Sequence, residues 1–325
     1  MADESLRGRF VWHELLTSDT ASAAPFYKKI VGWKTAPWPN DASYTLFMAG
    51  SQPVAGLMAL PEDAKKNGAL PNWLTYIGTG DVDETVRRLT DLGGKLLKPA
   101  EDLPSTGRFA VVQDPQGAVF GLYTPTQPQP GSGRPKVGEF SWHELACEDP
   151  ASVWTFYQKL FGWEKTSAMD MGPQGTYQMF GWKGQPVGGI MKRPPNMPSY
   201  WMPYAMIADA RAAAKTVAKL GGRIANGPME VPGGDWIVNG IDLQGAFFSV
   251  HSLKPAAVKP AAKLASKKAA APKAKKTAKA SRKTMKVQKA KPATKAVAKK
   301  TKKTKRAKKV TRRAAPRRAR AGKKR

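Results

Sequence analysis

The sequence has very little cysteine and histidine. Of its 325 residues, one is Cys and three are His. The single Cys147 excludes an intramolecular disulfide framework and a zinc site built from cysteines, and it indicates a reducing compartment. A facial triad of two His and one carboxylate needs two His in one domain, and His13 is the only His before His143. The sequence therefore has few of the side chains that hold transition metals.

Long apolar runs are also missing. No stretch approaches the roughly 20 apolar residues of a membrane helix, and the opening residues MADESLRGRF lack the apolar core of a signal peptide. We therefore expect a cytoplasmic protein without a membrane span. No phosphate loop, dinucleotide fingerprint or HExxH signature occurs, so no short motif indicates nucleotide binding or zinc proteolysis.

Acidic residues are absent from one end of the chain. Residues 254–325, the basic tail, contain 31 of the 54 Lys and Arg and no Asp or Glu. The preceding residues carry 23 basic and 24 acidic side chains, so the tail accounts for the formal net charge of +30. Because it has almost no large apolar side chains to offset the entropy of ordering, we expect it to be disordered. Its Lys, Ala and Pro composition resembles the tails of linker histones.

The charge of the basic tail predicts binding to DNA or RNA. Each Lys or Arg placed on a phosphate releases condensed counterions, which makes affinity steeply dependent on salt. Without aromatic side chains or a fixed scaffold, base readout is not expected, so binding should be nonspecific and should associate the protein with the nucleoid. A solubilising role and contact with an anionic membrane surface are the alternatives. The densest basic positions are Lys302, Lys303, Lys305, Arg306, Lys308, Lys309, Arg312, Arg313, Arg317 and Arg318.

The part of the chain before the basic tail contains an internal repeat. The segment FVWHELLTSD at 10–19 returns as FSWHELACED at 140–149, and QPVAGLM at 52–58 returns as QPVGGIM at 185–191. Matches in the same order predict a duplication, and hence two similar domains. The predicted parts are a first domain at 1–126, a linker at 127–137, a second domain at 138–253 and the basic tail at 254–325.

Each predicted domain contains two similar units. In the first unit, an apolar run at 10–16 precedes a helix at about 20–31, which Asp19 caps. Three short strands follow. The second unit repeats this order, with a strand at 73–79 and a helix at about 82–92. We therefore predict an α+β fold with two βαβββ units in each domain.

This order resembles the vicinal oxygen chelate superfamily, which includes glyoxalases, extradiol dioxygenases and bleomycin-resistance proteins. The resemblance covers 8–126 and 138–253. It depends on the doubled βαβββ order, an FY-x-x-x-x-GW end to the first helix and a D-x-x-G turn before the last strand. It implies that paired units curl into a half-barrel cup, and that the domains pair within the chain or as a homodimer.

The resemblance also implies where a metal would be held, because metalloenzymes of the family place ligands on the first and last strands of each unit. In the first domain these positions fall at Trp12, at Leu74 or Trp73, and at Gly121, and strand 54–60 has no Glu, His, Asp or Gln. We therefore predict no bound cofactor, with a divalent metal on displaced ligands as the alternative. The second-domain positions are Trp142, Trp201 or Met202, and Ser249.

The two WHEL segments are the first candidates for a site. Strand alternation puts Trp12 and Glu14 on one face and His13 on the other, and the metal-position alignment places the Trp12 face inside the cup. Glu14 is then a polar anchor or general base in a Trp-lined pocket, or a glutamate satisfied by a backbone group or a surface Arg. His13 is expected to be a hydrogen-bonded interior residue. The second-domain counterparts are Trp142, His143 and Glu144.

Paired aromatic residues are the second candidates. Trp73 with Tyr76, and Trp201 with Tyr204, lie on the first strand of the second unit in each domain, which we expect to be the edge strand of that unit. They are either stacking walls for a flat ligand or aromatics of the core or of a domain interface. No residue is assigned as catalytic.

Three functions are compatible with the sequence. The favoured one is a metal-free protein of this fold that binds a small organic ligand in its cups and is held on DNA by its tail. The second is a glyoxalase- or dioxygenase-type metalloenzyme with displaced ligands. The third is a nucleoid-associated architectural protein whose domains only pair.

Overall fold

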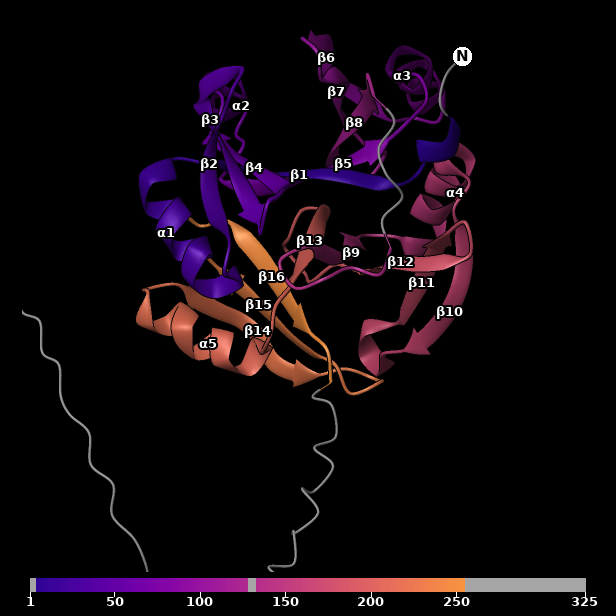
Figure 1. Ribbon diagram of the computed structural model, residues 1–325. Helices are drawn as coiled ribbons and strands as arrows, with labels where there is room; N and C mark the ends of the chain where they lie inside the picture. The colour runs from indigo at the N-terminus through magenta and orange to yellow at the C-terminus, as the bar shows by residue number, and fades with distance from the viewer. Residues whose placement is uncertain (1–3, 128–132, 255–325) are drawn as a thin grey trace, which may run out of the picture. The chain divides into compact units, whose positions relative to one another are not determined.

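A computed structural model describes residues 4–127 and 133–254 of the protein (Figure 1). Two mixed sheets of eight strands each, with few helices, form two tandem domains of the vicinal oxygen chelate type, which confirms the predicted α+β fold. The predictions for the basic tail lie outside the described residues. No helix in the described part of the chain is long and apolar enough to cross a membrane.

The two domains contain the same elements in nearly the same order. The first comprises a 3-10 helix (Glu4–Leu6), β1 (Phe10–Thr17), α1 (Thr20–Val31), β2 (Lys34–Trp38), β3 (Asp41–Ala49), β4 (Gln52–Ala59), α2 (Glu62–Lys66), β5 (Asn72–Gly78), α3 (Val82–Asp91), β6 (Lys95–Leu103), β7 (Gly107–Gln113) and β8 (Val119–Pro125). The second comprises β9 (Phe140–Cys147), α4 (Pro150–Phe161), β10 (Glu164–Asp170), a 3-10 helix (Gly172–Gln174), β11 (Thr176–Trp182), β12 (Gln185–Lys192), β13 (Tyr200–Met206), α5 (Ala210–Lys219), β14 (Arg223–Glu230), β15 (Trp236–Ile241) and β16 (Phe247–Ser252).

The strand order of each sheet joins its two units at their first strands. The first sheet runs β2-β3-β4-β1-β5-β8-β7-β6, and the second repeats this order from β10 to β14. β1 pairs in parallel with β4 and antiparallel with β5, and β5 pairs in parallel with β8. β5 and its counterpart β13 are the edge strands of their own units, as expected, and they become central in each sheet because they pair with the first strand of the preceding unit.

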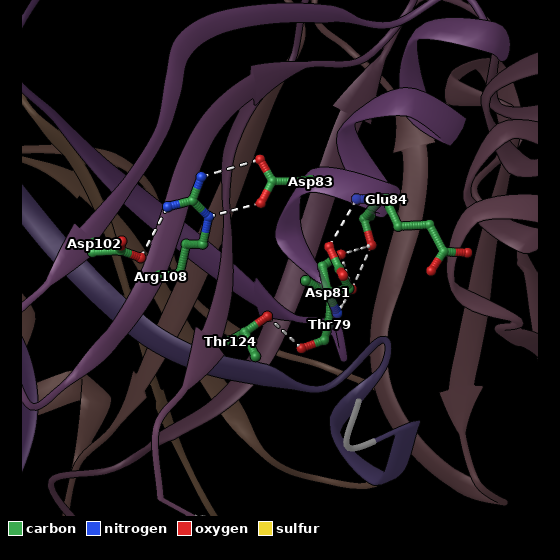
Figure 2. Close-up of polar contacts among 8 residues, drawn as sticks. Thr79, Asp81, Asp83, Glu84, Asp102, Arg108 and Thr124 are labelled. Carbon is green, nitrogen blue, oxygen red and sulfur yellow. Dashed lines mark hydrogen bonds and ion pairs between the residues drawn. The ribbon is translucent and has the colours of Figure 1, made fainter. Parts of the chain in front are cut away.

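Local sequence fixes the ends of the helices. Asp19 accepts a hydrogen bond from the backbone N–H of Ser22 at 3.0 Å, and the predicted cap of α1 is thus present. Gly32 ends α1 with φ of 88°, a left-handed conformation that a residue with a side chain rarely adopts. Asp81 caps α3 in the same way, through the N–H of Glu84 at 2.9 Å (Figure 2).

Each hydrophobic core is built from both domains. α1 lies beside α5, and α3 lies beside α4 (Figure 1). In the first core, the ring of Phe248 on β16 packs edge-on against Phe26 and Tyr27 of α1, with centroids 5.7 and 5.6 Å apart. In the second core, Phe120 of β8 packs against Tyr157 of α4 at 5.7 Å. The two domains therefore pair within the chain.

The motifs that indicated the family meet across this domain boundary. The hydroxyl of Tyr27, from the FY motif of α1, donates to Asp242, from the D-x-x-G turn before β16, at 2.9 Å. Asp242 also accepts the backbone N–H of Ala246, and Tyr27 accepts the indole N–H of Trp73 at 3.0 Å. Burial raises the pKa of Tyr27 well above its usual value, so this hydroxyl keeps its proton. Trp201, Tyr157 and Asp114 repeat the arrangement in the other core.

Candidate functional site

A cavity of about 500 Å³ lies in the cup of the first domain. Its volume falls within the roughly 300–1,000 Å³ typical of small-molecule sites. Trp12, Glu14 and Leu16 of β1 line it at alternate positions, as expected when one face of a strand is turned to the cup. The aromatic side chains of the lining are Trp12, Trp38, Tyr44, Tyr76, Phe109 and Tyr123.

A buried carboxylate and two phenols form the polar part of this cavity. The side chain of Glu14, 7% exposed as a residue, accepts hydrogen bonds from the hydroxyl of Tyr44 at 2.6 Å and from that of Tyr76 at 3.0 Å. The indole N–H of Trp12 donates to the hydroxyl of Tyr44 at 3.0 Å. The partners of Glu14 are thus two tyrosines, and not the backbone group or surface Arg that sequence reasoning considered.

The environment shifts the proton affinity of these groups. Burial raises the pKa of Glu14, while the hydrogen bonds from Tyr44 and Tyr76 and the charge of Lys98 oppose that rise. Burial and the nearby carboxylate raise the pKa of both tyrosines. The two phenols therefore stay protonated and act as hydrogen-bond donors to Glu14.

Two glycines provide the space in which the phenols reach Glu14. A Cβ atom at Gly56, which pairs with Glu14 across β1 and β4, would lie 1.8 Å from the hydroxyl oxygen of Tyr44. A Cβ atom at Gly121 of β8 would lie 2.1 Å from the ring of Tyr76. Since real Cβ atoms do not approach that closely, any larger residue at either position would displace a tyrosine.

The residues of the cup do not fit the metal of the family. Trp12, Leu74 and Gly121, which occupy predicted ligand positions, have no side-chain donor for a divalent ion. Both carboxylate oxygens of Glu14 already accept phenol hydrogens. Across residues 4–127 and 133–254, no group of three or more His, Cys, Asp and Glu is arranged to hold a metal.

The second domain repeats the polar network and extends it by two further polar residues. Glu144 accepts from Tyr177 at 2.9 Å and from Tyr204 at 2.6 Å, and the indole of Trp142 donates to Tyr177 at 2.7 Å. Asn239 then donates to the hydroxyl of Tyr204 at 3.0 Å and to Ser249. The matching pair in the first domain is Val111 and Gly121, whose side chains have no polar atoms and form no such bonds.

Trp73 and Trp201 lie on the opposite face of their strands from Tyr76 and Tyr204. Trp73 is 7% exposed and packs in the first core, where it donates to Tyr27. Trp201 occupies the same place in the second core. Of the two alternatives for this tryptophan pair, the structure thus places both in the core between the domains.

The two WHEL histidines meet across the domain boundary. Nε2 of His13 lies 2.9 Å from Nε2 of His143, and both side chains are buried. Nδ1 of His143 lies 3.2 Å from the carbonyl oxygen of Val187, which assigns its proton to Nδ1. His13 is therefore the donor of the pair. Each ring stacks on a phenylalanine of the other domain, His13 on Phe140 and His143 on Phe10.

Sequence reasoning missed Tyr44, Tyr177 and Trp38. Tyr44 and Tyr177 align at an offset of 133, which also relates QPVAGLM to QPVGGIM, so the internal repeat contained a signal for them. Trp38 has no aromatic counterpart at that offset, and sequence comparison within the chain gave no reason to select it.

An ion-pair cluster lies on the face of β7 opposite to the cavity. Arg108 of β7 contacts both carboxylate oxygens of Asp83 on α3, at 2.7 and 3.1 Å, and Asp102 of β6 at 2.9 Å (Figure 2). The next residue, Phe109, lines the cavity because alternate residues of a strand face opposite sides. The cluster thus holds α3 against the strand that carries Phe109.

Residues 9–122 match the model of the Glyoxalase/Bleomycin resistance protein/Dioxygenase superfamily. The chain is also 32% identical over 249 residues to CFP32 of Mycobacterium tuberculosis, a protein named as a glyoxylase, and the match covers 75% of this chain and 94% of that protein. The protein therefore belongs to the glyoxalase/bleomycin resistance/dioxygenase superfamily.

Particular relatives differ in the functions that their names give. DnrV of Streptomyces peucetius, named as an anthracycline biosynthesis protein, is 26% identical over 267 residues, which cover 76% of this chain and 94% of that protein. Among solved structures, the Mn(II)-bound glyoxalase of Novosphingobium aromaticivorans aligns with a TM-score of 0.52 at 15% identity, covering 76% and 82% of the two chains. A variant of homoprotocatechuate 2,3-dioxygenase from B. fuscum aligns with a TM-score of 0.56 at 14% identity, and the alignment covers 76% of this chain and 72% of that chain. At these identities the structures show a shared fold only.

Proposed function

We propose that the protein binds a small organic ligand in the first-domain cavity without a metal, and that the basic tail holds it on nucleic acid. The observation that carries the first part is the cavity of about 500 Å³, lined by six aromatic side chains around one buried carboxylate. A few fixed polar groups in a largely apolar pocket are typical of sites for small molecules.

A difference between the two cups supports the location in the first domain. In the second cup, Asn239 and Ser249 add hydrogen-bonded side chains where the first cup has Val111 and Gly121. Relatives named for anthracycline biosynthesis are consistent with a polycyclic ligand in such a cavity.

A metalloenzyme with displaced ligands is the main alternative. Elemental analysis of the full chain, purified without chelators or metal-affinity steps, separates the two functions. We expect no stoichiometric transition metal. One metal ion per chain would contradict the proposal and would favour enzyme chemistry, with Glu14 and Glu144 as the first residues to replace.

The ligand site can be tested with a cavity-filling variant. Val111→Phe places a ring inside the first cup, and Asn239→Val is its matched control in the second cup. In a fragment screen on the full chain by ligand-observed NMR, aromatic compounds should bind the wild type and the control but not Val111→Phe. Binding that survives Val111→Phe would contradict the location. A screen without hits, combined with DNA compaction by the full chain, would favour the architectural function instead.

A further inference from the structure

The charges and rings of the first-domain cavity define the chemistry of its ligand. We propose that the cavity recognises an organic cation, a flat or compact ammonium or iminium compound, with Glu14 as its counter-ion and the aromatic walls as its packing surface. This inference depends on the proposed function and adds the chemical class of the ligand.

Negative charge predominates in the lining. Its carboxylates are Glu14, Asp41 and Glu101, and its one basic side chain is Lys98. The charge of Lys98 acts on Glu14, but the ammonium of Lys98 lies 2.6 Å from Glu101 and forms its ion pair there. Among residues 4–127 and 133–254, no Lys, Arg or His forms an ion pair with Glu14 or Asp41. A desolvated carboxylate without an ion-pair partner is costly, and a cationic ligand in contact with Glu14 would compensate its charge.

The aromatic walls are suited to a cation. The faces of Trp, Tyr and Phe rings attract cations within about 6 Å of their centroids. One wall already shows this contact, because Nζ of Lys98 lies 4.5 Å from the centroid of Phe109. Trp12, Trp38, Tyr76 and Tyr123 line the same cavity.

The hydrogen-bond donors of the cavity argue against an anionic ligand. The hydroxyls of Tyr44 and Tyr76 donate to Glu14, and the indole of Trp12 donates to Tyr44. The hydroxyl of Tyr123 donates to the carbonyl oxygen of Thr106 at 2.8 Å. An anion would have to break these bonds and then lie beside a buried carboxylate.

Three fluorescent probes of similar three-ring size but different charge test the inference: 10-methylacridinium, neutral acridone and anthracene-9-carboxylate. They are titrated against the nucleic-acid-free full chain. We expect the cation to bind at least about tenfold more tightly than acridone, because a desolvated cation–π contact together with pairing to a carboxylate provides a difference of that size. Glu14→Gln should weaken binding of the cation by about tenfold or more and leave the affinity for acridone unchanged. The matched control Glu144→Gln, which alters the same network in the second cup, should leave all three affinities unchanged.

The ranking of the probes on the wild type needs no variant, so the test remains decisive if Glu14→Gln does not fold. Asp41→Asn, at an exposed position, is a second variant, and it should weaken binding of the cation only. Preferential binding of acridone or of anthracene-9-carboxylate, lost in Val111→Phe, would overturn the cationic class and leave the proposed function intact. Failure of all three probes to bind would overturn both.

Discussion

At the scale of the residue, Glu14 is the group whose surroundings most affect both stability and binding. Because burial raises its pKa, the folded state holds the proton more tightly than the unfolded chain. The folded state is therefore penalised as pH rises from the ordinary glutamate range through the raised pKa. A cationic partner would remove part of this penalty.

Glu14→Gln is accordingly expected to stabilise the free protein at pH 7 and to have a smaller effect at pH 4.5. Urea denaturation of both proteins at the two pH values measures this difference. A stabilisation that is equal at both pH values, or a loss of stability at pH 7, would show that the ionised carboxylate is not penalised.

Gly56→Ala tests the packing that positions the same carboxylate. The added methyl would lie 1.8 Å from the hydroxyl oxygen of Tyr44, so the phenol must move away from Glu14. We expect a loss of about 1–3 kcal/mol in the free energy of unfolding, as for other overpacked sites. Gly133→Ala, where nothing lies within 4 Å of the added atom, is the control and should change stability by less than about 0.5 kcal/mol.

Part of this site is predictable from the sequence. Strand alternation put Trp12 and Glu14 on the cavity face, because a period of two is a local property of the backbone. The tyrosine partners of Glu14 were not predicted, since β3 and β5 approach β1 only through the strand order of the sheet. Trp73 could not be assigned to a face for the same reason.

At the scale of the element, β1 and β9 are joined by the contact of His13 with His143. Burial, together with the charge of His143, lowers the pKa of His13, and burial lowers the pKa of His143 to about 3. The unfolded chain then binds more protons than the folded one, so stability falls as pH drops from about 6.5.

The double variant His13→Leu with His143→Leu should remove this acid sensitivity. Each histidine contributes a slope of up to about 1.4 kcal/mol per pH unit between the two pKa values. Tm measured from pH 7 to pH 5 should fall steeply in the wild type and less in the variant. Parallel curves for the two proteins would contradict the assignment of both rings as neutral.

The positions of α1 and α3 were predictable, whereas the place of β5 was not. Helix caps such as Asp19 and Asp81 act within a few residues, and the sequence contains the whole signal. Whether β5 has one neighbour or two depends on how the two units join, and that joining involves strands separated by about half a domain.

At the scale of the whole molecule, the shared cores should make the two domains unfold together. Each core contains side chains from both repeats, so loss of either sheet exposes both. Urea unfolding of the full chain should be one transition, coincident by circular dichroism and by tryptophan fluorescence.

Phe248→Ala tests this coupling from one side. Its ring packs against α1 of the other domain, and its removal should cost about 3–5 kcal/mol while the single transition is kept. The appearance of two separate transitions would mean that each domain is stable alone.

The basic tail predicts a behaviour of the whole chain on DNA. Replacement of its ten densest basic residues, Lys302 to Arg318 as given above, by Gln should reduce the slope of log affinity against log salt. Each lost phosphate contact contributes about 0.9 to that slope. Fluorescence anisotropy with two unrelated duplexes gives the slope and shows whether sequence matters. An unchanged slope would exclude these residues from the interface.

The contact of Tyr27 with Asp242, and of Tyr157 with Asp114, has a consequence for ancestry. Each D-x-x-G turn receives a tyrosine from the opposite repeat, so the same pairing would form between two identical copies of one repeat. A single-repeat ancestor could therefore have completed its cores only by self-association. Two copies on one chain can diverge, and the difference between Val111 with Gly121 and Asn239 with Ser249 is one that a symmetric pair of identical chains could not have on one side alone.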